Sequence, residues 1–118
     1  GDAVRREVGA ALLAGLRRMD VACRYGGEEL VVLMPDCPAA DALRRAEEIC
    51  ALVRGLRDRA GDGLPPVTVS IGVAAWPEHG ERIGKVIEAA DAALYAAKRA
   101  GRDRAMPAEA AMPALTVG

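Results

Sequence analysis

Two glycines followed by two carboxylates separate two apolar runs of this chain. The sequence Gly26-Gly27-Glu28-Glu29 follows Val21–Cys23 and precedes Leu30–Met34, a pattern typical of a β-hairpin closed by a Gly-Gly turn. Side chains alternate along a strand, so Glu28 and Glu29 point to opposite faces and do not form a general acid and base side by side. Either one carboxylate serves a site at the turn, or both are solvated glutamates on a surface hairpin. The turn alone leaves both interpretations open.

Two cations gather near the other end of the chain. An amphipathic helix is expected from about Arg82 to Ala100, and Gly101 suits the left-handed position that ends a helix. Lys98 and Arg102 then lie close together at one helix end, where positive charge interacts favourably with the helix dipole. The single histidine, His79, has no other metal-ligating residue near it in sequence, and we expect it to be structural or solvated.

The elements that would position these residues follow from apolar periodicity. An earlier helix, capped by Asp2, has its apolar stripe at every fourth residue, and a second helix starts near Pro38. Residues 57–66 have the composition of a loop, and the β-branched run Val67–Ala74 predicts a strand. Helix, hairpin, helix, strand and helix in this order favour an α+β fold with helices on a mostly antiparallel sheet.

Composition excludes several classes of protein. The 118 residues are enough for one domain, and 52% of them are apolar, without phenylalanine. A net charge of −1 argues against binding to a nucleic-acid polymer. Three cysteines without C-x-x-C spacing are expected to be reduced thiols of a cytoplasmic protein. No apolar run is long enough for a membrane span, so we expect no membrane contact within this segment.

Several segments resemble the GGDEF family, the diguanylate cyclases that condense two GTP into cyclic di-GMP and pyrophosphate. Gly26-Gly27-Glu28-Glu29-Leu30 is similar to the signature loop, with leucine where the family usually has phenylalanine. The other matching segments occur in the family's order, over residues 1 to 104: Gly1-Asp2, the R-x-x-D of Arg17 and Asp20, the strand Val67–Ala74, the A-D-x-A-L-Y-x-A-K pattern of Ala90–Lys98, and Gly101-Arg102.

The resemblance implies roles for individual residues. Glu28 would be a metal ligand at the catalytic centre, with Mg²⁺ or Mn²⁺ as cofactor, and Glu29 a partner carboxylate. Gly26 and Gly27 would let the phosphates of GTP approach the backbone, because they lack a Cβ. In the same way, the resemblance places Lys98 and Arg102 on the phosphates and Asp2 on the guanine edge.

The resemblance also implies regulation and assembly. Arg17 and Asp20 would form an inhibitory site for the product cyclic di-GMP, with Glu48 at a position where the family often has a second arginine. Each domain of the family holds one GTP, so a homodimer is the expected active form. A sensory or receiver domain is expected upstream.

The family pattern begins earlier than this chain does. Its F-D-x-D segment, which supplies a metal aspartate and a central strand, is missing from the sequence. We therefore expect residues 1–104 to be part of a GGDEF domain, with a nucleotidyl-cyclase-like, ferredoxin-like antiparallel sheet that lacks its N-terminal strand and first helix, and residues 105–118 to be a mobile Ala/Pro-rich tail. The fragment alone is expected to be inactive. The alternatives are a non-catalytic cyclic di-GMP receptor and a structural or swapped partner of another chain.

Overall fold

The computed structural model describes residues 9, 10, 12, 14–26, 28–60 and 68–108. Residues 9, 10, 12, 14 and 15 are helical, and Leu12 and Leu16 pack on the core as the predicted stripe requires. No helix within the described ranges is long and apolar enough to cross a membrane. The elements that follow are β1 (Val21–Gly26), β2 (Glu29–Pro35), α2 (Ala39–Ala60), β3 (Ser70–Trp76), α3 (Ile83–Arg99) and β4 (Arg104–Pro107).

The four strands form one mixed sheet in the order β1-β2-β3-β4. Only the β1-β2 hairpin is antiparallel, whereas β2 pairs with β3, and β3 with β4, in parallel. The α+β class is therefore confirmed, but the expectation of an antiparallel sheet is wrong beyond the hairpin. The reason is connectivity: α2 and α3 each carry the chain back across the sheet, so the next strand runs in the same direction as the last.

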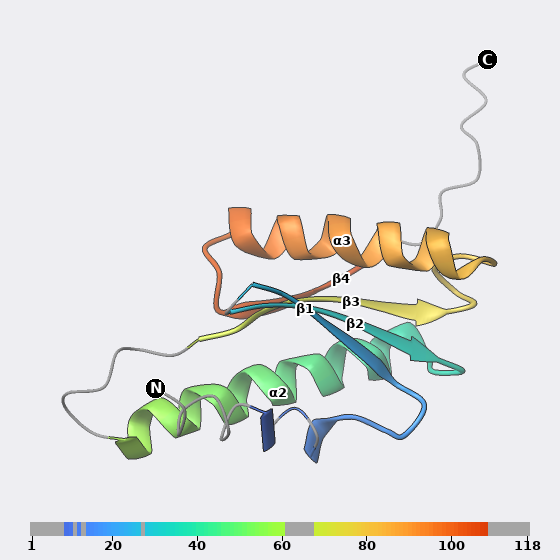
Figure 1. Cartoon of the computed structure of the whole chain (residues 1–118). Coiled ribbons are helices and arrows are strands. Elements are labelled where there is room, and N and C mark those ends of the chain that lie inside the picture. The colour runs from blue at the N-terminus through green and yellow to red at the C-terminus, as the bar shows by residue number, and fades with distance from the viewer. Residues whose placement is uncertain (1–8, 11, 13, 27, 61–67, 109–118) are drawn as a thin grey trace.

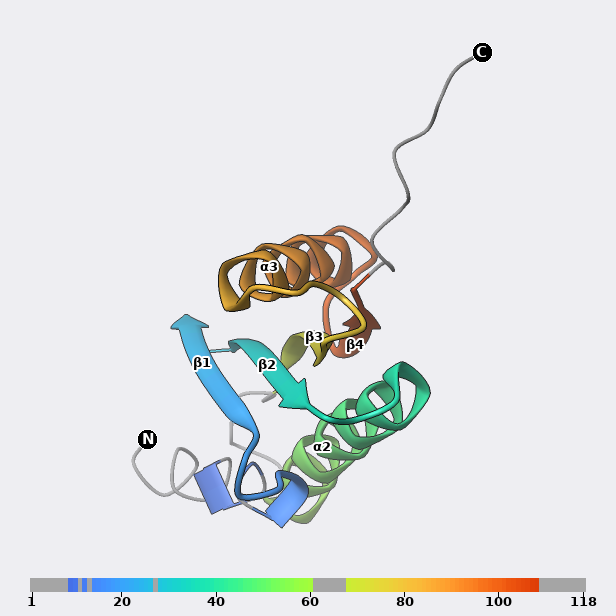
Figure 2. The same cartoon turned by 90° about the vertical axis from the view of Figure 1, so that its right-hand side faces the viewer.

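The helices cover opposite faces of this sheet, which gives three layers (Figures 1 and 2). Alternation along the strands divides the core accordingly. Leu30, Val32 and Met34 of β2 belong to the cluster that includes α2, whereas Val31 and Leu33 belong to the cluster that includes α3. A strand buried on both faces reads as a continuous apolar run, which explains the sequence of β2.

Gly72 of β3 permits a very close approach of α3 to the sheet. A Cβ at this position would overlap the carbonyl oxygen of Ala90 and the amide nitrogen of Leu94, and would lie 2.9 Å from the Leu94 Cα. A glycine within a strand allows another backbone to come close, and at Gly72 that backbone belongs to α3. The position of α3, and of the cations at its C-terminal end, thus depends on this glycine.

Several boundaries differ from those expected. Strand β4 was not predicted, and its residues 105–107 belong to the sheet rather than to a mobile tail; residues 109–118 lie outside the described residues. The second helix continues through residues 57–60, which composition assigned to a loop. Ile83, at the first turn of α3, is 47% exposed.

The thiols provide a test of this packing. Cys23 is exposed on β1, whereas Cys50 is buried beneath β3, and burial raises the pKa of its thiol to about 11. Because the thiolate is the reactive species, iodoacetamide at pH 8 is expected to modify Cys23 rapidly and Cys50 only after unfolding. Peptide mass spectrometry with and without urea checks this result. Equal rates at the two cysteines in the folded protein would contradict the structure.

Candidate functional site

The signature turn lies at one end of the sheet and is tied to β3. Gly26 pairs with Glu29, so the two residues between the strands are Gly27 and Glu28 rather than the two glycines. The register shifts between Arg24 and Gly26, which marks an irregularity in the strand just before the turn. The exposed Glu28 uses its backbone carbonyl to accept a hydrogen bond of 2.9 Å from the Ser70 amide. The backbone at the turn is thus fixed, while the Glu28 side chain is at the surface.

Glu29 draws together the two cations that the sequence placed at the end of α3. Its Oε1 lies 3.1 Å from the Lys98 Nζ and 3.4 Å from the Arg102 Nη1, a residue 73 positions away in sequence. Glu29 and Lys98 are about one-quarter and one-third exposed, whereas the Arg102 side chain is more than half exposed. The predicted proximity of Lys98 and Arg102 is thus present in the described structure, and their pairing with Glu29, which was not predicted, places two positive charges around one carboxylate.

The negative charge of Glu29 persists over the neutral pH range. The hydrogen bond from Lys98, followed by the contribution of Arg102, holds the pKa of Glu29 below its ordinary value of 4.5. A carboxyl with a lowered folded-state pKa stabilises the folded state above pH 4.5. That contribution is lost as the pH falls through the lowered pKa. Between pH 6 and 8 the Glu29 carboxylate therefore remains ionised beside the two basic side chains.

The end of α3 brings Arg102 to this position. The helix ends at Arg99, and Gly101 takes the positive φ of 120° that the sequence predicted for a helix-ending glycine. The Arg102 amide then donates to the Ala97 carbonyl at 2.9 Å, which caps the last turn. Arg102 itself has a φ of 61°. The chain therefore reverses within a few residues and directs the Arg102 guanidinium towards β2.

The described residues do not by themselves form a metal centre. Within 9–60 and 68–108, less the masked positions, no group of three or more His, Cys, Asp or Glu side chains comes together. Glu29 already pairs with two cations, which leaves the Glu28 carboxylate as the candidate ligand. A single carboxylate would supply only part of the six-oxygen shell of Mg²⁺, and the other ligands would be waters, substrate phosphates or further protein groups.

Arg17 and Asp20 contact each other. The Arg17 guanidinium donates to Asp20 Oδ1 through Nε at 3.1 Å and Nη2 at 2.9 Å, and its backbone amide donates to Oδ2 at 2.7 Å. Arg17 Nη2 also donates to the Pro35 carbonyl at 2.6 Å, so the pair ties this turn to the end of β2. The Asp20 side chain is fully buried, and the hydrogen bond with Asp20 raises the pKa of Arg17. A role of this pair in binding cyclic di-GMP stays a prediction.

Two of the expected site residues lie outside the described residues, namely Asp2 and Gly27. Asp91 and Ser70 were not expected to contribute. The Asp91 carboxyl on α3 raises the pKa of Tyr25, the residue before the glycines, to about 12, while Ser70 holds the Glu28 carbonyl. A local sequence pattern predicts neither contact, because the two partners of each are more than 40 residues apart in the sequence.

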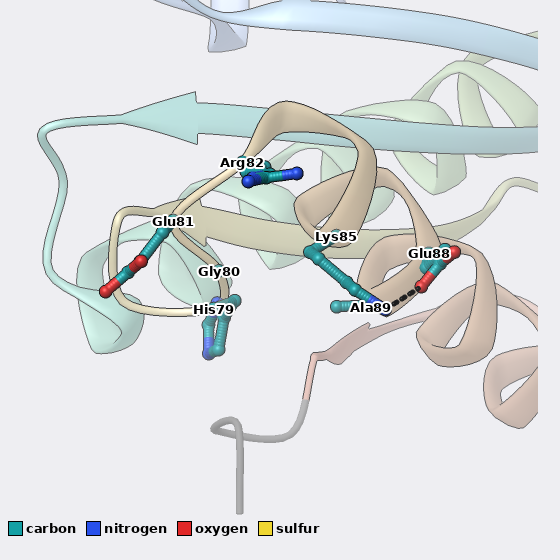
Figure 3. Close-up of a pocket in the computed structure, with 7 residues that line it drawn as sticks. All are labelled: His79, Gly80, Glu81, Arg82, Lys85, Glu88 and Ala89. Atoms are coloured by element: carbon teal, nitrogen blue, oxygen red, sulfur yellow. Dashed lines mark hydrogen bonds and ion pairs between the residues drawn. The ribbon is translucent and has the colours of Figure 1, made fainter.

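A concave surface at the other end of α3 is separate from this cluster (Figure 3). It includes His79, Arg82 and Lys85, and the Lys85 ammonium pairs with Glu88 at 3.4 Å. His79 is buried, and its Nδ1 accepts a hydrogen bond of 2.8 Å from the Ala75 amide, which confirms a structural role. Lys85 and Lys98 are thirteen helical residues apart, about 20 Å along the axis. The two ends of α3 therefore cannot serve one small ligand.

Comparison with known proteins defines the class. The family model for "Diguanylate cyclase, GGDEF domain" matches residues 1–104. The chain therefore belongs to the GGDEF family. It is 44% identical over 105 residues to the response regulator PleD of Caulobacter vibrioides, an alignment that covers 87% of this chain and 23% of PleD.

Other relatives are named for the cyclase activity. The chain is 35% identical over 105 residues to diguanylate cyclase DosC of Escherichia coli, with 88% of this chain and 23% of DosC covered. It is 36% identical over 104 residues to diguanylate cyclase A of Treponema denticola, with 88% and 28% covered. The chain thus spans about a quarter of the length of these relatives.

Proposed function

We propose that the protein containing this chain is a diguanylate cyclase that condenses two GTP into cyclic di-GMP and pyrophosphate. The observation that carries the proposal is the convergence of Glu29, Lys98 and Arg102 beside the Glu28 turn. Two cations at one surface suit the negative charge of a triphosphate, and the adjacent glycine turn leaves room for the phosphates. Membership of the GGDEF family and the names of two relatives support the same activity.

In this proposal the cations around Glu29 exchange partners when GTP binds. Lys98 and Arg102 contact the phosphates, Asp2 the guanine edge, and Gly26 and Gly27 line the approach. The 3′-hydroxyl of each GTP loses its proton and attacks the α-phosphorus of the other, so that two phosphodiester bonds form in turn and two pyrophosphates leave. Charge stabilisation and positioning supply most of the catalysis in such a transfer. Since each domain holds one GTP, two chains related by a two-fold axis bring the reactants together.

Glu28 is proposed as one ligand of a Mg²⁺ or Mn²⁺ ion, and Glu29 as the carboxylate that holds the cations. The remaining metal ligands are proposed to come from the family's F-D-x-D segment, which residues 1–118 do not contain, so these residues alone are expected to be inactive. The proposed setting is the cytoplasm, where GTP is available. An upstream regulatory domain is also part of the proposal, supported by the relative named a response regulator.

The proposal is tested by measuring whether the products form. The full-length protein is incubated with GTP and Mg²⁺, and chromatography with mass spectrometry quantifies cyclic di-GMP and pyrophosphate. Formation of both supports the proposal. A protein that binds GTP or cyclic di-GMP without forming product would refute it.

The receptor alternative is tested by titrating cyclic di-GMP against wild type and Arg17→Ala. A ligand contact by the planar guanidinium predicts about a 10-fold or greater loss of affinity. Because Arg17 also pairs with buried Asp20, thermal unfolding of the variant is followed in parallel. Unchanged affinity in a folded Arg17→Ala protein would remove both the receptor function and the inhibitory site at Arg17.

A further inference from the structure

The loop that presents Arg102 has an unusual backbone. Arg102 and Asp103, with φ of 61° and 48°, are consecutive non-glycine residues in the left-handed region. Side chains with a Cβ seldom adopt this conformation, and two in succession persist only where the surroundings hold them. Something outside the loop must therefore fix its shape.

The fixing contacts converge on Asp103. The Arg54 Nε donates to Asp103 Oδ1 at 2.9 Å, and the Arg54 Nη2 donates to the Asp103 backbone carbonyl at 2.9 Å. The Asp103 amide donates to the Ser70 Oγ at 3.2 Å. The carboxylate, carbonyl and amide of one residue are thus all held. The planar guanidinium suits this task because its two donors engage side chain and backbone at once.

The anchors come from elements distant in the sequence. Arg54 belongs to α2, on the opposite face of the sheet from α3, and is 49 residues from Asp103. Ser70 is the first residue of β3, and its amide also holds the carbonyl of Glu28 at the signature turn. The loop that carries Arg102 and the turn that carries Glu28 are therefore both hydrogen-bonded to Ser70 of the sheet. Arg54 holds the same loop from the α2 side, through its hydrogen bonds to Asp103.

We propose that Arg54, acting through Asp103, is a positioning residue. It sets the place of the Arg102 guanidinium opposite Glu29, and thereby the contact of this guanidinium with the nucleoside triphosphate. This inference rests on the proposed function. In this proposal Arg54 does not touch the ligand, since its Nε and Nη2 donate to Asp103. The effect of Arg54 on GTP binding should thus pass entirely through Arg102.

The experiment is a double-mutant cycle in the full-length protein, with kcat and KM for GTP as readouts. Arg54→Ala is expected to raise KM about 5- to 10-fold with little change in kcat, a size typical of residues that act through one another. Arg102→Ala should raise KM further, and the double variant should be no worse than Arg102→Ala alone. Arg44→Ala is the matched control, since Arg44 pairs with Asp41 and Glu48 on the exposed face of the same helix.

A conservative change provides the second arm. Asp103→Asn keeps an acceptor oxygen and a side chain that tolerates positive φ, so it should retain most of the wild-type KM, whereas Asp103→Ala should behave like Arg54→Ala. Hydrogen exchange at residues 100–104 should accelerate in Arg54→Ala and not in Arg44→Ala. A purely structural role would lower the unfolding temperature but leave KM unchanged.

The outcomes are distinguishable. Additive effects of Arg54→Ala and Arg102→Ala on KM, or an unchanged KM in Arg54→Ala, would overturn the positioning role. If Arg54→Ala left hydrogen exchange at residues 100–104 unchanged, the positioning role would be overturned, whether or not the protein binds GTP. A wild-type protein that neither binds nor converts GTP would instead refute the proposed function, and the exchange measurement would still decide whether Arg54 fixes the loop.

Discussion

Replacing Gly72 with alanine is expected to lower the free energy of unfolding by about 3 kcal/mol or more, the upper part of the range for overpacked cores. The added methyl group would meet the Ala90 carbonyl and the Leu94 amide, which are backbone atoms of α3 and cannot rotate away. The helix would have to move off the sheet. Since α3 carries Lys98, the loss of stability should be accompanied by loss of the cation cluster at Glu29.

Gly84→Ala is the matched control for this prediction. Gly84 lies in α3, the helix that packs on Gly72, and a Cβ at Gly84 would meet nothing within 4 Å. Alanine is the better helix former, so this change should be neutral or stabilise by up to ~1 kcal/mol. Differential scanning fluorimetry and hydrogen exchange of α3 peptides compare the two variants. A Gly72→Ala protein with the unfolding temperature of wild type would show that α3 does not pack as described.

Lys98→Ala is expected to raise the KM for GTP about 10- to 100-fold, the range for losing a hydrogen bond to a charged group. Lys98 Nζ lies 3.1 Å from Glu29 in the nucleotide-free structure, and the proposed function transfers this ammonium to the phosphates. The loss should be larger for GTP than for GMP, because GMP lacks the β- and γ-phosphates. Initial rates and competition by GMP provide the measurement.

Lys85→Ala controls for the loss of a lysine from α3. Lys85 is 71% exposed, pairs with Glu88 and lies at the other end of the helix. Its removal should leave KM unchanged. If Lys98→Ala and Lys85→Ala had the same KM as wild type, the assignment of Lys98 to the phosphates would be wrong.

The parts of the fold that could be predicted are those with a local signal. Alternating β-branched residues identified β3, and the 3.6-residue period identified α3 with Gly101 at its end. Strand β4 lacks such a signal, because Arg104-Ala-Met-Pro107 contains no β-branched residue and ends in proline. It becomes a strand through its parallel pairing with β3 at the sheet edge, where proline is tolerated. The direction of the β2-β3 pairing likewise depends on tertiary connectivity.

The residues of the candidate site likewise divide into those with a local sequence signal and those without one. The sequence placed Lys98 near Arg102 because they are four residues apart, but the pairing of both with Glu29 was not predicted, since Glu29 is about 70 residues away in the sequence. The contacts of Arg54 with Asp103 carried no signal, since arginines on helix surfaces are common and the partners are 49 residues apart. The proximity of Arg17 and Asp20 could be predicted from their spacing of three residues, and the structure adds that the two side chains form an ion pair with each other.

The most direct measurement of the central claim is the rate of cyclic di-GMP formation by full-length Glu28→Gln protein beside wild type. Glutamine preserves the size and removes the charge of the side chain at the turn. We expect at least about a 100-fold loss of rate, since even indirect partners of a metal contribute 10- to 100-fold. Glu88→Gln, at an exposed glutamate of α3 that pairs with Lys85, should retain the wild-type rate. Equal rates in wild type and Glu28→Gln would contradict the placement of the catalytic centre at this turn.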